Sequence, residues 1–395
     1  MYRHEIDEQK GTLKLWVRRK KGNKLLRCSN CGGLCKTVEE VRDREVQDLP
    51  WRKYQTTVVV EYFRVGCPQC GVRVELLDQL PSKAPFSKDF EDAVGLACES
   101  AAARQVARQF QLAASTVRAI DQRYLERWAK TRKKSVLRQV GVDEIYLGKS
   151  KKFLTVVSNL ETGEPLWFGQ GRQKDTLGSF FREELSALQR SRITAACVDM
   201  WEPFTASILE WAPQCRIVYD KFHIMQHANQ AVDEVRRAEF FRKGGILRGL
   251  VKGKRWLLLT RWVNLESEKR QLLNDLFRLN RRLLKAYLLK ESLDGLWTYT
   301  YEGAAKRYLH NWIDQLRWQR LEPFKKLAEM LLNHQEGLLN YCRTPVRFGV
   351  VEAVNSNIKA LIRRGRGYTN LRYLLLKAQR LASLKTEFLL LRKVA

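Results

Sequence analysis

Four of the nine cysteines have the spacing of a metal site. Cys28 and Cys31 form one C-x-x-C-G unit, and Cys67 and Cys70 form a second. Each unit lets two thiolates reach one tetrahedral ion from a tight turn, and the glycine that follows relieves the backbone where N–H groups face the sulfurs. Two such units in one short segment predict a structural zinc ion held by these four cysteines. Free thiols or a redox motif are the alternative, and Cys35 is a spare thiol that could replace a ligand.

Three acidic residues far apart in the chain stand where strands end or a helix begins. Asp143 lies in a predicted strand over 139–147, Asp199 closes a predicted strand over 193–198, and Glu352 begins a predicted helix. Carboxylates at buried strand ends cost free energy unless a positive group meets them, and in so basic a chain Arg or Lys could do so. The sharper hypothesis is that the three converge on two divalent ions about 3.5–4 Å apart. Hard oxygen ligands and a phosphate substrate favour Mg²⁺ there.

A D-x-x-H pair follows the predicted strand over 216–219. His223 could position a phosphate or carry a proton near neutral pH. Asp220 could support the metal ligands or rival Asp199 as one of them. The alternative is that Asp220 caps the helix starting at Lys221 while His223 packs beneath the sheet.

The predicted helix at Glu352 carries further candidates. Asn355 and Lys359 share its face, because they follow at i+3 and i+7. Lys359 could hold a phosphate or be a solvated cation, and Asn355 could orient a carboxylate or a DNA oxygen. Three arginines continue the positive surface and are predicted to contact backbone phosphates rather than bases: Arg363, Arg364 and Arg366.

Five blocks of sequence would position these residues. Residues 1–80 are predicted to be short strands around the cysteines, including 12–17 and 58–65, and residues 232–343 are almost wholly helical. Residues 136–231 suggest three antiparallel strands and then alternating helix and strand, with one helix over 177–188, so we expect a mixed α/β sheet. The last helices, 344–395, are expected to complete that core.

Residues 81–135 resemble a helix-turn-helix. Two short helices, a tight connection at 111–114 and a following basic helix fit the motif. Ser115, Thr116 and Arg118 would then begin a recognition helix in a DNA major groove. A plain helical spacer is the alternative.

Composition limits the function classes. The 395 residues include 72 Lys and Arg against 43 Asp and Glu, a net charge of +29, which points to a polyanionic partner. With 45% hydrophobic residues the chain can build a core, and no apolar run is long enough to span a membrane. The beginning of the chain lacks a secretory signal, so we expect a reducing compartment and core roles for the isolated cysteines: Cys98, Cys197, Cys215 and Cys342.

The whole chain resembles the ISL-three family of bacterial insertion-sequence transposases. The motifs that carry the likeness are the two C-x-x-C-G units, the helix-turn-helix-like block, and residues 140–144, 198–200, 220–223, 352–359 and 363–368. The resemblance implies a ribonuclease-H-like core whose Asp-Asp-Glu triad maps onto Asp143, Asp199 and Glu352. The interval between Asp199 and Glu352 is too long for a plain core, so the helical block would be an insertion.

A member of that family would bind the terminal inverted repeats and target DNA as double strands. It would use two Mg²⁺ ions for phosphodiester hydrolysis and strand transfer, as a homodimer or larger assembly. We expect it in the bacterial cytoplasm, with the nucleoid. The alternatives are a non-catalytic zinc and helix-turn-helix regulator, or a metal nuclease that cleaves without joining.

Overall fold

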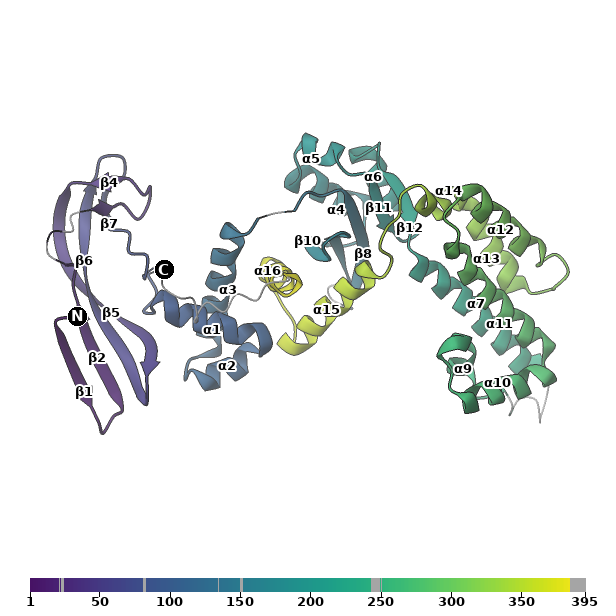
Figure 1. Ribbon diagram of the computed structural model, residues 1–395, viewed down its shortest axis with the longest axis horizontal. Helices are drawn as coiled ribbons and strands as arrows, with labels where there is room; N and C mark the ends of the chain where they lie inside the picture. The colour runs from purple at the N-terminus through teal and green to yellow at the C-terminus, as the bar shows by residue number, and fades with distance from the viewer. Residues whose placement is uncertain are drawn as a thin grey trace. The chain divides into compact units, whose positions relative to one another are not determined.

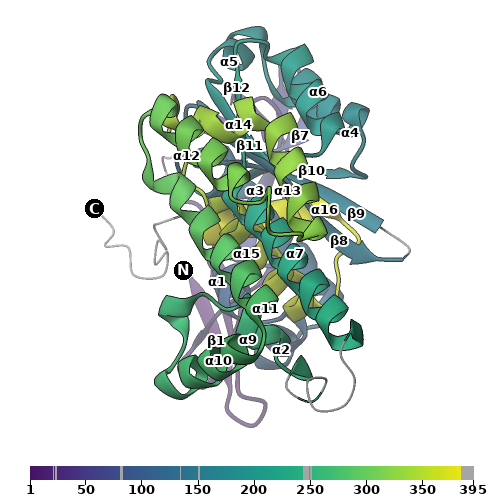
Figure 2. The ribbon, with the colours of Figure 1, turned by 90° about the vertical axis from the view of Figure 1, so that its right-hand side faces the viewer.

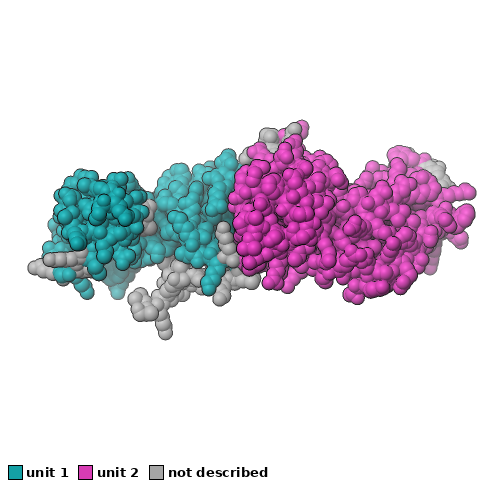
Figure 3. All heavy atoms as spheres, turned by 90° about the horizontal axis from the view of Figure 1, so that it is seen from above, with its two compact units in different colours: residues 1–133, 364–395 teal, residues 134–363 magenta. Residues whose placement is uncertain are grey.

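The computed structural model describes residues 1–20, 22, 25–80, 83–133, 135–149, 152–242, 249 and 251–383. The chain forms two compact units, which Figure 3 shows in different colours. Unit 1 comprises Met1–Lys133 and Arg364–Ala395, and unit 2 comprises Lys134–Arg363. Helices and strands are labelled as in Figure 1.

A five-stranded sheet, ordered β1-β2-β6-β5 with β7 added to β6, opens unit 1. Its strands are β1 (Arg3–Asp7), β2 (Thr12–Val17), β5 (Thr37–Trp51), β6 (Tyr54–Cys67) and β7 (Gly71–Val74), and a small pair, β3 (Leu26–Arg27) and β4 (Leu34–Cys35), lies apart. The predicted strands over 12–17 and 58–65 are confirmed. The long strand β5 was not predicted, because it lies at the sheet edge and alternates charged side chains that do not read as a half-buried strand.

Three helices follow, α1 (Lys88–Ser100), α2 (Ala103–Gln109) and α3 (Ala114–Thr131). Their shared core confirms the predicted helical period and includes Phe90, Val94, Val106 and Ile120. Gln111, in the turn between α2 and α3, has a φ of +54°. The two helices and tight turn match the predicted helix-turn-helix outline.

The last described helix of the chain, α16 (Leu371–Ala382), packs on α1 and α3. Residues 364–395 therefore group with unit 1, whereas the sequence suggested that 344–395 complete the α/β core. The physical reason is a set of buried ion pairs across the helices. Lys377 Nζ lies 2.5 Å from Asp121 Oδ2, and Arg380 Nε lies 2.7 Å from Glu99 Oε1.

Unit 2 is built on a second five-stranded sheet, in the order β10-β9-β8-β11-β12. The pairs β8–β9 and β9–β10 are antiparallel, and β11 is parallel to both β8 and β12, which confirms the predicted mixed direction. The strands are β8 (Gln139–Gly148), β9 (Lys152–Asn159), β10 (Glu164–Gln170), β11 (Ala195–Val198) and β12 (Arg216–Tyr219).

Helices cover both faces of this sheet. One face packs under α4 (Lys174–Ser179), a π-helical turn (Phe180–Glu184) and α6 (Glu202–Trp211). On the other face, α15 (Val350–Gly365) approaches so closely that a Cβ on Gly141 would lie 2.6 Å from Val351 Cγ2. The prediction of a single helix over 177–188 was wrong. The structure has α4, the π-helical turn and a separate helix, α5 (Ala187–Ser191), which Ser186 starts with a capping box.

The predicted helical insertion extends from β12 to α15. It contains α7 (Lys221–Arg242), α9 (Arg255–Leu259), α10 (Ser267–Leu279), α11 (Arg281–Leu293), α12 (Glu302–Asp314), α13 (Glu322–Asn333) and α14 (Gln335–Leu339), with short 3₁₀ turns at Trp262–Asn264, Asp294–Thr298 and Asn340–Cys342. Helices α7 and α11 run side by side, as Figures 1 and 2 show. The Asn340 side chain donates to the Ile217 carbonyl (2.9 Å), so the insertion is tied to the sheet edge.

In the part of the chain that the structure describes, no helix has the length and apolar character needed to cross a membrane.

Candidate active site and metal centre

Three acids of unit 2 lie at one level on adjacent strands. The residues just before Asp143, Asp199 and Asp220 are paired with one another across β8, β11 and β12. Side chains alternate along a strand, so Asp143 and Asp199 share the face of Gly141 and Cys197, on which α15 packs. The acids therefore meet at the carboxyl ends of β11 and β12, where open α/β sheets place ligands.

His223, on the first turn of α7, lies among these acids. Its Nε2 is 3.5 Å from Asp143 Oδ1, and its Nδ1 is 3.9 Å from Asp199 Oδ2. Burial lowers the pKa of His223, but the hydrogen bond to Asp143 and the charges of Asp199 and Asp220 outweigh burial and raise the pKa to about 9. The protonated ring is thus the cation that balances the carboxylates in this structure. It faces the acids and does not pack beneath the sheet.

Asp220 is the most deeply buried of the acids, with 3% exposure. Its Oδ1 accepts the Phe222 backbone N–H (3.0 Å), so it caps α7, which was one of the two roles considered for it. Burial raises the pKa of Asp220, the charges of Asp143 and Glu352 raise it further, and His223 opposes them. Asp220 therefore caps α7 and also belongs to the acid cluster.

Helix α15 brings residues from far along the chain to the same place. Asn355 is 3% exposed, and its Nδ2 donates to Asp143 Oδ2 (2.6 Å) across 212 residues of sequence. Its Oδ1 is buried with no partner among the described residues. Glu352 lies nearly one turn earlier on the helix. The sequence allowed Asn355 to orient either a carboxylate or a DNA oxygen, and in the structure its amide holds a carboxylate.

The other basic candidates divide between surface and interior. Lys359, Arg363 and Arg366 are exposed. Arg364 instead donates to the carbonyls of Glu99 (3.0 Å) and Ser100 (3.2 Å), at the carboxyl end of α1. Its guanidinium therefore completes a helix end in unit 1.

Residues that could begin a recognition helix lie at the start of α3. Ser115 and Arg118 are exposed, and Thr116 is half-buried. Ala113 precedes the helix and makes no side-chain cap. The exposed start of α3 leaves these side chains accessible.

One group at this edge was missed by sequence reasoning. The Arg172 guanidinium lies 4.3 Å from the ring centroid of Phe153 and 4.5 Å from that of Trp201, and its Nη1 is 3.5 Å from Glu144 Oε1. Burial raises the pKa of Glu144, Asp143 raises it further, and Arg172 opposes them. Arg172 is a loop residue among 72 cations, and no spacing marks it.

The donor atoms of the acid cluster suit a hard divalent cation, but they are not drawn together. Among the described residues, only the cysteines place three or more potential ligand atoms within 4.8 Å of one another. Asp143, Asp199 and Glu352 do not form such a group, and the ring of His223 lies beside Asp143 and Asp199. Carboxylate oxygens and the unpartnered Asn355 Oδ1 fit Mg²⁺ in type.

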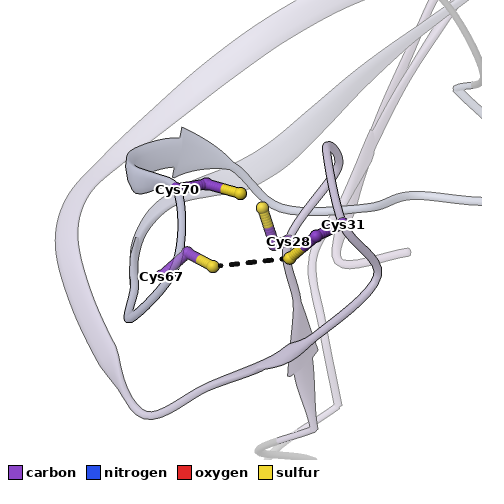
Figure 4. Close-up of side chains that lie close together, drawn as sticks. All are labelled: Cys28, Cys31, Cys67 and Cys70. Carbon is purple, nitrogen blue, oxygen red and sulfur yellow. Dashed lines mark hydrogen bonds between the residues drawn. The ribbon is translucent and has the colours of Figure 1, made fainter.

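The four cysteines of unit 1 do form one cluster, shown in Figure 4. Cys28 and Cys31 face Cys67 and Cys70, with all four Sγ atoms within 4.8 Å and 3.6 Å between Cys31 and Cys67. A tetrahedral zinc with bonds of about 2.3 Å needs sulfurs about 3.8 Å apart. The cluster therefore fits the predicted zinc ion.

The cysteines of this cluster shift in opposite directions: the Gly33 N–H lowers the pKa of Cys31, but hydrogen bonds with the other cysteines outweigh it and raise that pKa. The Gln69 N–H lowers the pKa of Cys67 to about 6, with burial opposing and the Cys70 N–H assisting. Cys35 lies outside the set of four, and its Sγ donates to the Gly33 carbonyl at 3.7 Å. It is a buried neighbour of the site.

The four remaining cysteines bear out their predicted core roles to different degrees. Cys98, Cys197 and Cys215 are buried, and Cys342 is half-buried.

Comparison with known proteins identifies relatives over most of the chain. The family model DDE_Tnp_ISL3, described as a transposase, matches residues 140–378. The transposase for insertion sequence element IS1001 of Bordetella parapertussis is 32% identical over 358 residues, 90% of this chain and 88% of that protein. The transposase for IS1557 of Mycobacterium tuberculosis is 27% identical over 372 residues, 87% and 83% of the two chains. A solved Drosophila P element transposase strand transfer complex matches with a TM-score of 0.41 and 10% identity, over 78% of this chain and 95% of that one.

Proposed function

The chain belongs to the ISL-three family of insertion-sequence transposases, and we propose that unit 2 is its ribonuclease-H-like catalytic domain. The support is the sheet, in which three antiparallel strands lead into two parallel ones and the adjacent strands β8, β11 and β12 each carry an acid at the same level. In this proposal the domain cleaves a phosphodiester at the ends of the element and directs the freed 3′-hydroxyl at target DNA.

Asp143, Asp199 and Glu352 are the proposed ligands of two Mg²⁺ ions, which when bound supply positive charge to the phosphodiester. Asn355 holds Asp143 in orientation through its amide. His223 balances the carboxylates, and we assign it a contact with the DNA phosphate. Asp220 anchors the start of α7, which carries His223.

Arg172 and Lys359 are proposed to hold the backbone of the reacting strand. Arg172 is held between two aromatic rings at the edge that bears Asp143 and Asp199, so its guanidinium is oriented before DNA arrives. Lys359 lies on α15 two turns after Glu352 and is exposed. A cation at each position would meet phosphates next to the scissile bond.

Unit 1 is proposed to bind the terminal inverted repeats as double-stranded DNA. Ser115, Thr116 and Arg118 would meet the major groove, and exposed Arg366 would meet phosphates, as would exposed Arg363, the last residue of unit 2. The four-cysteine cluster would hold zinc as a structural ion. We keep the expectation of a homodimer or larger assembly, acting on nucleoid DNA in the cytoplasm.

The observation that carries the catalytic proposal is the shared level of the three aspartates beneath α15. Its test is Asp143→Asn, with Asp175→Asn, an exposed acid of α4, as the matched control. We expect Asp143→Asn to bind a labelled duplex from the element end but to cleave none, while Asp175→Asn cleaves at the wild-type rate. A regulator would show no cleavage by any form. A nuclease would cleave, yet the wild type would fail to join pre-cleaved ends.

A further inference from the structure

Unit 1 places a cationic hairpin tip next to the helix-turn-helix. Strands β5 and β6 are joined by Arg52 and Lys53, both exposed, and Trp51 before them is 50% exposed. The next residue but one, Gln55, donates from Nε2 to Oε1 of Gln111 at 2.9 Å. Gln111 is the positive-φ residue of the turn before α3, so the tip and the start of α3 are neighbours.

The hairpin cannot move independently of the helices. The Gln47 N–H of β5 donates to the Pro85 carbonyl, and the Ser87 N–H donates back to Gln47, both at 2.9 Å. The Ser87 hydroxyl also donates to Asp48 Oδ1 (2.6 Å) while it caps α1. Backbone and side-chain bonds thus fix β5 to the first helix as well as to the turn.

The tip itself is built to present positive charge. The Arg52 guanidinium lies 5.0 Å from the ring centroid of Trp51, whose ring stacks on Tyr54 at 6.2 Å. Lys53 has an exposed ion pair with Glu8, whereas Arg52 has no ion pair in the described part of the chain. Arg52 also adopts a φ of +54°, where glycine would be unstrained. A large cation at this position indicates that the side chain is needed there.

The separation suits one stretch of DNA. Arg52 is three residues from Gln55, and Ser115 is four from Gln111, which at 3.8 Å per residue limits each segment to about 11 and 15 Å. One helical turn of DNA spans about 34 Å. The cysteine cluster lies at the other end of β6, roughly 40 Å away at 3.3 Å per residue, so it is a separate feature.

We propose that the hairpin tip, Trp51–Tyr54, is a wing that contacts the phosphate backbone of the duplex read by α3. The proposal rests on the DNA binding proposed for unit 1. Arg52 and Lys53 make the phosphate contacts, and Trp51 supports the guanidinium from behind. Gln55 and Gln111 set the spacing between wing and recognition helix.

The test measures how duplex binding depends on salt. The probe is a fluorescent 40-base-pair duplex from one end of the element, titrated by anisotropy between 50 and 200 mM KCl. Each phosphate contact contributes about 0.9 to the slope of log affinity against log salt. We expect the double variant Arg52→Gly, Lys53→Ala to reduce the slope by about 1.8. Between 50 and 200 mM KCl, its affinity should therefore fall by a factor about tenfold smaller than the factor for the wild type.

Controls keep the result interpretable. Arg52→Gly suits the positive φ, so melting should show an intact unit 1. Arg52→Lys keeps the charge and should keep the wild-type slope. Arg73→Ala removes an exposed cation from β7, at the cysteine end of the same sheet, and should also leave the slope unchanged.

Two outcomes would overturn the wing. The first is an unchanged slope in the double variant. The second is a slope reduced by about 0.9 in Arg73→Ala, the same reduction per cation removed, which would reduce the effect to net charge. These results are independent of catalysis. If the salt slope refutes the wing while the wild type still cleaves the duplex, the proposed function stands. If Asp143→Asn cleaves normally while the salt slope falls as expected, the proposed function is wrong and the wing stands.

Discussion

Removal of the Asn355 side chain should slow DNA cleavage without unfolding the enzyme. The amide donates to Asp143 Oδ2 at 2.6 Å from a buried position, whereas the Glu144 N–H (2.7 Å) and His223 Nε2 (3.5 Å) both approach Oδ1. A hydrogen bond to a charged group contributes about 1.5–3 kcal/mol. If the orientation of Asp143 is needed in the transition state, Asn355→Ala should lower the rate by roughly 10- to 150-fold.

The assay is single-turnover cleavage of a labelled element-end duplex at several Mg²⁺ concentrations. Asn355→Ala should require more Mg²⁺ for half-maximal rate, because Asp143 is less well oriented to bind it. Asn357→Ala is the matched control, since it removes the same side chain from an exposed position of α15. Duplex affinity, measured without Mg²⁺, should be equal in all three proteins.

Two results would refute this reasoning. Cleavage by Asn355→Ala at the wild-type rate and Mg²⁺ dependence would show that the bond to Asp143 does not matter. A tenfold loss of duplex affinity with unchanged Mg²⁺ dependence would instead make Asn355 a DNA contact, the other role that the sequence allowed.

Other perturbations test the metal cluster, the buried ion pair and the arginine at the active-site edge. Elemental analysis of the wild type should find one zinc per chain, which Cys67→Ser should abolish and Cys35→Ser should retain; zinc loss in both would place Cys35 among the ligands. Lys377→Met leaves the Asp121 side chain, 1% exposed, without its cation and should destabilise unit 1 by about 3–5 kcal/mol in denaturant unfolding. Adding Asp121→Leu should recover most of that loss, and no recovery would contradict the ion-pair explanation. Arg172→Ala should slow cleavage, and Arg172→Lys should restore only part of the rate, because lysine lacks the planar group that stacks between two rings. Full activity in Arg172→Ala would remove this residue from the site.

Local patterns predicted much of the architecture. The C-x-x-C-G units predicted a four-cysteine cluster because each pair is held by its own short turn. The period of apolar residues predicted helices α1, α2 and α3 and the strands of the mixed sheet. Elements whose stability is not local were missed. The charged edge strand β5 gains its stability from pairing with β6, and the π-helical turn after α4 comes from packing on the sheet.

The candidate site divides in the same way. The sequence indicated which acids end strands, and the pairing register then explains why Asp143, Asp199 and Asp220 are neighbours. Nothing in the sequence marked Arg172, because its partners Phe153 and Trp201 come from different elements.

By itself the sequence determined the chemistry available to this protein: paired thiols on short turns, carboxylates at strand ends, and a large excess of positive charge. The tertiary structure decided which groups meet. It set Asn355 against Asp143 across 212 residues and turned Arg364 and α16 toward the helices of unit 1. The reason is that turns and strand ends are governed by neighbours a few residues away, whereas the docking of α15 and α16 depends on buried surfaces and ion pairs that exist only after folding.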